Sequence, residues 1–213
     1  MYDLILFDLD GTLTLPETGI TRSVQYALGF FGINEKNPDN LRRFIGPPLV
    51  DGFMEFYNMS QNDALTAVEK YRERFSKTGI FENELIEGVP SMLKELKKYG
   101  KKLALATSKP APYSAKIVKH FGIDKYFDFL SCSELDGTHN DKSEIIAEAL
   151  KVAENCKFPV MVGDRKHDAI GAEKNSIPFI GVSYGYAADG ELEAFNPAAI
   201  ASDIYELQGI LLK

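Results

Sequence analysis

Cysteine, basic charge and long apolar runs are all scarce in this sequence, and each scarcity excludes a class of protein. Only Cys132 and Cys156 occur, which is too few for a disulfide framework or a zinc finger. Lysine and arginine number 24 against 31 aspartate and glutamate residues, so the net charge is −7. With no basic block and no apolar run near the roughly 20 residues of a membrane helix, we expect neither a nucleic acid polymer nor a membrane as partner. The cytoplasm, with both thiols reduced, is the expected compartment.

Short apolar segments alternate with amphipathic helices along most of the chain. Segments that are apolar on both faces are typical of parallel strands covered by helices on both sides. The expected strands are 4–7, 103–106, 127–130, 160–162 and 179–182. The expected helices between them include 89–99, 113–121 and 143–154. This alternation predicts an α/β fold with a doubly wound, Rossmann-like parallel sheet.

One long segment interrupts the alternation. Between residues 15 and 82 the patterning is helical, with amphipathic stretches at 20–31, 48–57 and 61–75. An ordinary connection from strand to helix has about 2–6 residues, so this segment is far too long to be one. We therefore expect a discontinuous core, residues 1–14 and 83–213, and an inserted all-helical cap domain, residues 15–82, over the carboxyl edge of the sheet.

Polar side chains follow the expected strands at the edge where open α/β sheets bind ligands. Asp8 and Asp10 follow the first strand, and Gly11 permits a tight turn that lets both acids face a ligand. Thr107 and Ser108 follow the strand at 103–106. The other candidates at this edge are Lys142, Asp164 and Asp168.

Four carboxylates brought together at one edge repel one another, and a bound divalent cation removes that repulsion. These acids are Asp8, Asp10, Asp164 and Asp168. Hard oxygen ligands without a histidine or thiolate cluster favour Mg²⁺ over zinc. Once a cation is bound, a phosphate can bind as well, through the Thr107 hydroxyl, a backbone amide at Ser108 and the Lys142 ammonium.

This arrangement suits phosphoryl transfer, in which catalysis is mainly positioning and charge neutralisation. An ionised aspartate can act as the nucleophile and form an aspartyl-phosphate. A second carboxylic acid can protonate the leaving oxygen and then take a proton from the attacking water. We assign the nucleophile to Asp8 and the acid/base to Asp10, which lies just beyond the strand.

The motifs, in this order, resemble those of the haloacid dehalogenase superfamily of phosphatases. The matching positions are Asp8-Leu9-Asp10-Gly11-Thr12, then Thr107, then Lys142, then Gly163-Asp164 with Asp168. The resemblance covers the whole chain, including the insert, which is similar to that superfamily's cap. It implies that Asp8, the Asp10 backbone carbonyl and Asp164 ligate Mg²⁺, with Asp168 in or beside that shell. It also implies that the chain is an enzyme, a phosphatase acting on a small phosphorylated metabolite.

Within the superfamily the sequence is similar to phosphoglycolate phosphatase-like proteins and, more narrowly, to a group of 5′-nucleotidases. Stretches 43–49, 135–138 and 161–168 support this similarity. Arg43 precedes a Gly-Pro-Pro loop and is expected to contact the substrate. Leu15 stands where relatives usually have an aspartate, and His139 where they often have a basic residue.

Several readings remain open beside hydrolysis of a phosphoglycolate-like phosphomonoester. A 5′-nucleotidase acting on nucleoside monophosphates is one, and a phosphosugar mutase, which shares every core motif, is another. A signalling receiver domain also gathers carboxylates, Mg²⁺, a hydroxyl and a lysine around a phosphorylated aspartate, but it has no helical insert. A non-catalytic binding protein of the same superfamily would not need the complete set of acids. We therefore favour a magnesium-dependent phosphatase that works through an aspartyl-phosphate.

Overall fold

The computed structural model describes residues 1–213, which form two compact units. Unit 1 comprises Met1–Leu15 and Leu85–Lys213, and unit 2 comprises Pro16–Glu84. The chain therefore leaves unit 1 after Leu15 and returns to it at Leu85. No helix of either unit is long and apolar enough to cross a bilayer.

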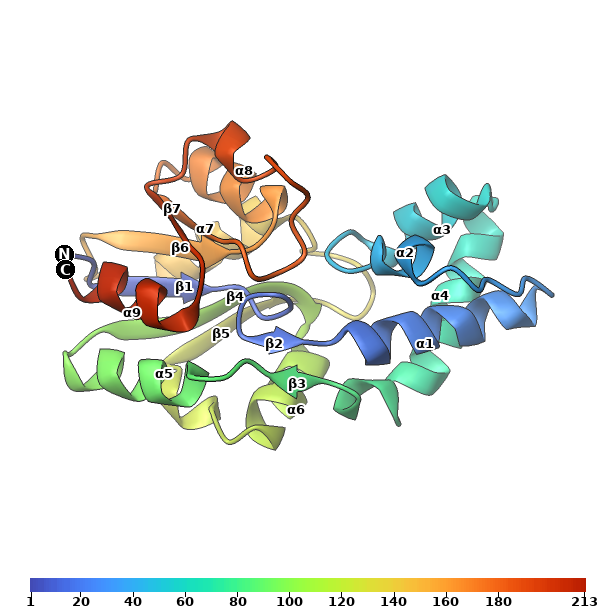
Figure 1. Ribbon diagram of the computed structural model, residues 1–213, viewed down its shortest axis with the longest axis horizontal. Helices are drawn as coiled ribbons and strands as arrows, with labels where there is room; N and C mark the ends of the chain where they lie inside the picture. The colour runs from blue at the N-terminus through green and yellow to red at the C-terminus, as the bar shows by residue number, and fades with distance from the viewer. The chain divides into compact units, whose positions relative to one another are not determined.

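Unit 1 is built on a six-stranded sheet in which neighbouring strands run parallel (Figure 1). The strand order is β5-β4-β1-β6-β7-β8. The strands are β1 (Leu4–Phe7), β4 (Lys102–Pro110), β5 (Phe129–Ser133), β6 (Pro159–Gly163), β7 (Phe179–Val182) and β8 (Ala199–Ala201). Successive strands lie to one side of β1 and then to the other. The prediction of a doubly wound parallel sheet is confirmed.

The central strand β1 lies between β4 and β6 and is buried along its whole length. Leu4 pairs with Lys102 of β4 and with Pro159 of β6, and the register continues to Phe7. All four side chains of β1 have 0% exposure, because helices cover both faces of the sheet. This burial explains why β1 is a continuous apolar run and does not alternate with polar residues.

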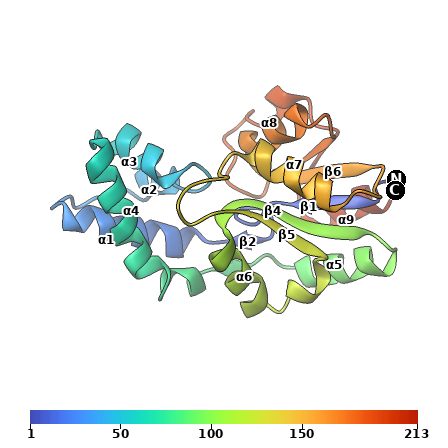
Figure 2. The ribbon, with the colours of Figure 1, turned by 180° about the vertical axis from the view of Figure 1, so that it is seen from behind.

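Helices α7 and α8 cover one face of the sheet, and α5, α6 and α9 cover the other (Figures 1 and 2). Their bounds are α5 Val89–Lys98, α6 Ala111–His120, α7 Lys142–Val152, α8 Lys166–Lys174 and α9 Ile204–Leu212. Leu4 and Leu6 of β1 pack with Ile145 and Ile146 of α7 in one buried apolar cluster. The side chains that alternate with them along β1 point to the opposite face.

Several boundaries differ from the sequence expectations. β5 begins two residues later than expected, because Asp124–Tyr126 forms a 3₁₀ turn (η2) before it. β4 continues to Pro110, and its ladder with β5 shifts register between Thr107 and Pro110. β8, α8, α9 and a 3₁₀ turn at Glu193–Phe195 (η3) were not expected from the sequence.

Unit 2 is helical, as the insertion was expected to be. Its elements are α1 (Glu17–Phe30), α2 (Pro38–Arg42), α3 (Leu49–Tyr57), α4 (Gln61–Phe75) and a 3₁₀ turn, η1 (Gly79–Phe81). α4 begins at Ser60, whose side chain accepts a hydrogen bond from the Asp63 N–H and so satisfies one free donor of the first turn. Gly19 of α1 packs so closely on η1 that a Cβ there would overlap the Gly79 carbonyl oxygen.

Two short strands mark the places where the chain passes between the units. β2 (Thr14–Leu15) and β3 (Glu84–Leu85) form a separate two-stranded sheet. The Ile86 N–H continues this pairing by donating to the Leu13 carbonyl oxygen at 3.1 Å. Leu15 thus lies in β2 and is half-buried.

Candidate active site

The predicted residues of the core come together at the carboxyl edge of the sheet. Asp8 directly follows β1, and Thr107 lies in the last half of β4. Asp164 follows β6, and Asp168 lies in the first turn of α8. Lys142 is the first residue of α7. Parallel strands direct these five residues to one edge, because every strand ends on the same side of the sheet.

Three of the acids form a tight cluster. Carboxylate oxygens of Asp8, Asp164 and Asp168 all lie within 4.8 Å of one another, and all three residues are buried. Their closeness confirms the convergence of the first and fourth strand ends that the sequence predicted. Carboxylates at this separation in a buried site repel strongly unless a cation or a proton lies between them.

Lys142 lies beside this cluster and binds two of its members. Its Nζ is 2.7 Å from Asp8 Oδ1 and 2.8 Å from Asp168 Oδ1, and it donates to the Ala106 carbonyl oxygen at 3.0 Å. Burial alone would lower the pKa of Lys142, but the charges of Asp168 and Asp8 outweigh it and raise that pKa above its ordinary value. The ammonium group is therefore a permanent positive charge of the site.

Asp164 carries the clearest sign of a missing partner. Its Oδ2 accepts a hydrogen bond of 2.7 Å from the Tyr186 N–H, whereas its Oδ1 is buried without any hydrogen-bond partner. Burial, followed by the charges of Asp168 and Asp8, holds the pKa of Asp164 well above its ordinary value. An unpaired buried carboxylate oxygen costs free energy, so this oxygen points to a ligand.

Asp168 is held at both of its oxygens. Oδ1 pairs with Lys142, and Oδ2 accepts a hydrogen bond of 3.1 Å from the Arg165 N–H at the start of α8. Burial raises the pKa of Asp168 to about 6, although Lys142 acts in the opposite direction. Gly163 is required beside it, because a Cβ at that position would overlap the Asp168 carboxylate.

Asp10 is not part of the three-acid cluster, and it forms an ion pair with a different lysine, Lys109. Its Oδ2 is 2.7 Å from Lys109 Nζ, and its Oδ1 is buried without a hydrogen-bond partner. Burial raises the pKa of Asp10 despite the opposing charge of Lys109. The two acids of the Asp8-Leu9-Asp10 pair are thus held by different lysines.

The turn after β1 depends on glycine. Gly11 has a φ of +82°, a conformation that L side chains rarely adopt, and a Cβ there would overlap the carboxylate of Asp164. Gly185, in the loop after β7, packs on Asp164 from another direction, and a Cβ there would overlap the Asp164 side chain. Backbone from two loops therefore encloses this aspartate.

Two of the residues predicted to bind phosphate, Thr107 and Ser108, already make hydrogen bonds within the protein. Thr107 is buried, and its Oγ1 accepts a hydrogen bond of 3.3 Å from the Lys109 N–H. The Ser108 hydroxyl donates to the Asn140 carbonyl oxygen at 3.1 Å, which ties β4 to the loop before α7. A role of Thr107, Ser108 and Lys142 toward phosphate remains a prediction.

Arg43, the predicted substrate contact, belongs to unit 2. Its guanidinium carbon lies 4.3 Å from the centre of the Phe56 ring, and its Nη2 donates to Asn40 Oδ1 at 3.4 Å. These local contacts orient the side chain without any ligand. Its contact with substrate stays a prediction.

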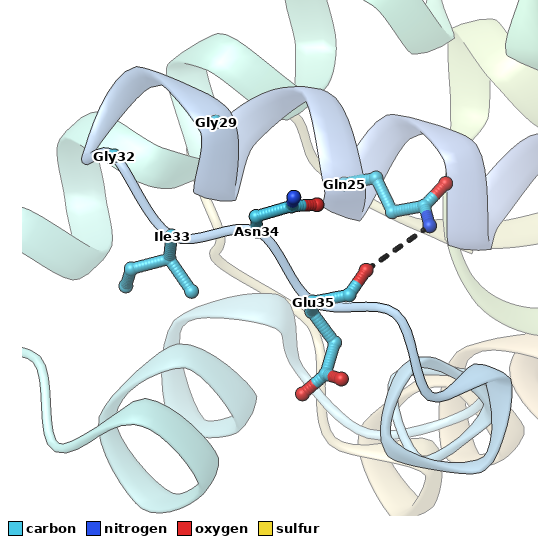
Figure 3. A pocket seen from close by; sticks show the side chains of 6 residues that line it. All are labelled: Gln25, Gly29, Gly32, Ile33, Asn34 and Glu35. Carbon is cyan, nitrogen blue, oxygen red and sulfur yellow. Dashed lines mark hydrogen bonds between the residues drawn. The ribbon is translucent and has the colours of Figure 1, made fainter.

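A pocket of about 260 Å³ lies within unit 2 and is lined by Gln25, Gly29, Gly32, Ile33, Asn34 and Glu35 (Figure 3). Glu35 is its only ionisable lining residue, and this carboxylate already accepts hydrogen bonds from the Asn37 N–H, Asn40 and Tyr57. The Glu35 carbonyl oxygen accepts from Gln25 as well. The pocket therefore offers no reactive group.

A divalent cation fits the residues at the sheet edge. With all groups ionised, Asp8, Asp10, Asp164 and Asp168 carry four negative charges, and the two lysines that pair directly with acids of this set, Lys109 and Lys142, carry two positive charges. The charge of Arg165 also acts on Asp164, but no ion pair joins the two side chains. The candidate metal ligands are carboxylate oxygens, which Mg²⁺ prefers, and the cluster contains neither a thiolate nor an imidazole. The unpartnered Asp164 Oδ1 supplies a ready ligand.

Sequence reasoning missed two contributors to this site. The Lys109 side chain, whose burial was not predicted from the sequence, is 7% exposed and pairs with Asp10. The loop after β7 reaches Asp164 through the Tyr186 N–H, and the Tyr184 hydroxyl donates to the Thr12 carbonyl oxygen at 3.1 Å. The available signals were a lysine shortly after a buried strand, for Lys109, and tyrosines on either side of Gly185 after another buried strand, for the second loop.

The doubly wound sheet and the acidic site at its carboxyl edge together place the protein among the phosphatases built on this kind of fold. More narrowly, residues 5–182 match the family described as haloacid dehalogenase-like hydrolase, so the chain belongs to that family. The family expected from the motifs is thus confirmed, and the enzyme is a phosphatase.

Individual relatives are similar over nearly the whole chain. A 5′-nucleotidase of Pseudomonas aeruginosa is 45% identical over 99% of this chain and 96% of its own length. The tyrosine-protein kinase PtkA of Mycobacterium tuberculosis is 36% identical over 98% of this chain and 72% of its own. The crystal structure of a predicted phosphatase from Clostridium acetobutylicum superposes with a TM-score of 0.94 at 42% identity, covering 100% of this chain and 99% of that one.

Proposed function

We propose that the protein hydrolyses a small phosphomonoester in a magnesium-dependent reaction that passes through an aspartyl-phosphate on Asp8. The observation that carries this proposal is the division of the aspartate pair: Asp8 is paired with Lys142, and Asp10 is paired with Lys109. Two carboxylates that are close in sequence but differently held can take two different chemical roles.

In the first step Asp8 acts as the nucleophile. Lys142 holds Oδ1 of Asp8, which fixes the carboxylate for attack on the phosphorus through its other oxygen. As that bond forms, the bond from phosphorus to the leaving oxygen breaks. Asp10, whose pKa burial raises above its ordinary value, gives its proton to that oxygen.

In the second step the phosphoryl group passes from Asp8 to water. Asp10, now a carboxylate, accepts a proton from the water as its oxygen attacks phosphorus. The bond from phosphorus to the Asp8 oxygen breaks, and Asp8 returns to a carboxylate. The Thr107 hydroxyl and the Lys142 ammonium bind phosphoryl oxygens during both steps.

The residues that would hold Mg²⁺ are the carboxylates of Asp8, Asp164 and Asp168 with the backbone carbonyl of Asp10. When bound, the ion neutralises negative charge on the phosphoryl oxygens and relieves repulsion within the acid cluster. Support comes from the spacing of the three carboxylates and from the unpartnered oxygen of Asp164. Tyr186 and Arg165 orient two of these acids through backbone N–H groups.

Among substrates we propose a nucleoside 5′-monophosphate. The support is the similarity, over almost the full length of both chains, to the Pseudomonas aeruginosa 5′-nucleotidase. Phosphoglycolate and phosphosugars share the chemistry of the leaving oxygen and are the alternatives. The chain has no Gly-Lys-Ser/Thr phosphate loop, which favours hydrolysis over transfer from ATP despite the similarity to PtkA.

A phosphate-release panel tests the proposal. The purified protein is incubated with nucleoside 5′-monophosphates, phosphoglycolate, pyrophosphate and a hexose phosphate, with Mg²⁺ or with EDTA. We expect release of phosphate that EDTA abolishes and Mg²⁺ restores, fastest with a nucleoside monophosphate. An isomerised sugar phosphate without free phosphate would show a mutase. Labelling of a tyrosine peptide from ATP would show a kinase.

A further inference from the structure

We propose that Lys109 is a positioning residue that holds Asp10 in place for proton transfer to the leaving oxygen. This inference rests on the proposed function. Lys109 Nζ lies 2.7 Å from Asp10 Oδ2, and the two side chains are only 7% and 14% exposed. Lysine is almost never buried unless it is paired, so the pair with Asp10 accounts for the inward direction of this side chain.

The backbone of β4 directs Lys109 into the site. Thr107 pairs with Cys132 and Pro110 with Ser133, so two residues of β4 have no counterpart in β5. A bulge of this kind changes the direction of a side chain next to an active site. Ser108 and Lys109 are the two extra residues, and Lys109 is the one whose side chain reaches Asp10.

Three hydrogen bonds fix this bulge. The Lys109 N–H donates to Thr107 Oγ1 at 3.3 Å, and the Lys109 carbonyl oxygen accepts from Ser114 Oγ at 3.2 Å. Ser133 Oγ donates to the Ser108 carbonyl oxygen at 2.7 Å. The backbone that carries Lys109 is therefore held on both sides, by β5 and by α6.

The pair leaves one oxygen of Asp10 for chemistry. Oδ2 is bound to Lys109, and Oδ1 is buried with no hydrogen-bond partner. Lys109 prevents the carboxyl group from turning toward Lys142, which already binds Asp8 and Asp168. The proton therefore leaves from Oδ1 as the bond from phosphorus to the leaving oxygen breaks, and the electron pair of that bond receives it.

Two esters with different leaving groups test this role. A p-nitrophenolate leaves without a proton, whereas the alkoxide of a nucleoside needs one. The ratio kcat/KM reports only the steps up to the first irreversible one, which is loss of the leaving group. We expect K109M to reduce kcat/KM for a nucleoside 5′-monophosphate on the order of 100-fold and for p-nitrophenyl phosphate by about threefold or less.

Conservative and unrelated variants supply the controls. K109R, which keeps a cation at Asp10, should restore most of the activity on the nucleoside ester. K116M removes an exposed lysine of the adjacent α6 and should leave both rates unchanged. If K109M does not fold, K109Q, measured with its melting temperature, replaces it. Equal losses on both esters, or no loss on either, would overturn the proposal.

A parallel variant of Asp10 separates this inference from the proposed function. D10N should show the same preference for the aryl ester, and K109M should add little to it in the double variant, since Lys109 acts through Asp10. If D10N shows no preference between the esters, the acid role of Asp10 is wrong. If D10N shows the preference and K109M does not, only the role of Lys109 is wrong.

Discussion

The backbone N–H of Tyr186 donates a 2.7 Å hydrogen bond to Oδ2 of Asp164 and so joins the loop after β7 to the loop after β6. The other oxygen of Asp164 has no partner in the protein. One oxygen is thus fixed by the fold, and the other is left to a ligand. A backbone donor suits this purpose, because its position depends on the course of the loop and not on a rotamer.

Enlarging Gly185 should disturb this hydrogen bond. A Cβ at that position would overlap the Asp164 side chain and the Gly11 carbonyl oxygen, whereas Gly185 itself does not have a positive φ, so G185A crowds Asp164 and the turn after β1 without forcing residue 185 into a left-handed conformation. We expect Mg²⁺ affinity, measured by calorimetry, to fall about 10- to 100-fold. The control is G209A in α9, where the added Cβ meets no atom within 4 Å. It should raise the free energy of unfolding by about 0.5–1 kcal/mol. Unchanged affinity in G185A would contradict the positioning of Asp164 by this loop.

Replacing the nucleophile should stop turnover without unfolding the protein. D8N keeps the shape of the side chain, but a neutral amide cannot attack phosphorus to form the acyl phosphate. Neither phosphate release nor a phosphorylated protein after acid quenching is expected. D124N, which removes an exposed acid from η2, should behave as the unchanged protein. Activity in D8N close to that of the unchanged protein would contradict the assignment.

The acid cluster should make the stability of the protein depend on Mg²⁺. Burial and two neighbouring acids raise the pKa of Asp164, which shows that its charged form is disfavoured when no cation is bound. We expect D164N to melt at a higher temperature than the unchanged protein in EDTA. Mg²⁺ at about 100 times its dissociation constant should stabilise only the unchanged protein, by about 2.7 kcal/mol. An equal response of D164N to Mg²⁺ would place the ion elsewhere.

Glu82 should make unit 2 sensitive to acid. Its carboxylate accepts hydrogen bonds from Arg74 at 2.7 and 2.9 Å and from Arg22 at 2.9 Å, and these bonds lower its pKa below the ordinary value of 4.5. Because the pKa is lower in the folded state, the pairing stabilises the fold above the unfolded pKa and is lost as pH falls through the folded one.

The measurement is denaturant unfolding of E82Q and of the unchanged protein as a function of pH. At pH 7 E82Q should be less stable by about 1 kcal/mol, since the pair is partly exposed to solvent. The difference should shrink as the pH falls below 4.5. R42K, which keeps a cation near Glu17 in the same unit, should show no such change. A difference that does not vary with pH would rule out this ion pair as its source.

The acids of the site were predictable because their signal is local. Leu4–Phe7 is a run of four buried apolar residues, and Asp8 and Asp10 follow it directly. Parallel strands then bring the ends of β1 and β6 to one edge whatever the intervening sequence. The family motifs add the same residues independently.

The parts that escaped prediction depend on geometry that the sequence does not display. Lys109 enters the site because of a bulge, and a lysine after an apolar strand looks the same when it is solvated. Tyr186 contributes a backbone N–H, for which residue type carries no signal. Helix α8 buries small residues such as Ala169 and Ala172, which do not form a conspicuous apolar stripe.

The central position of β1 also has a consequence for biosynthesis. Leu4 pairs with Lys102 on one side and with Pro159 on the other, so this strand cannot complete its ladders until most of the polypeptide has left the ribosome. Unit 2 is contiguous in the chain and can fold as soon as it emerges. The segment that bears Asp8 is thus synthesised first, and the strand before it can complete its pairing only after residues 102–105 and 159–162 have been synthesised.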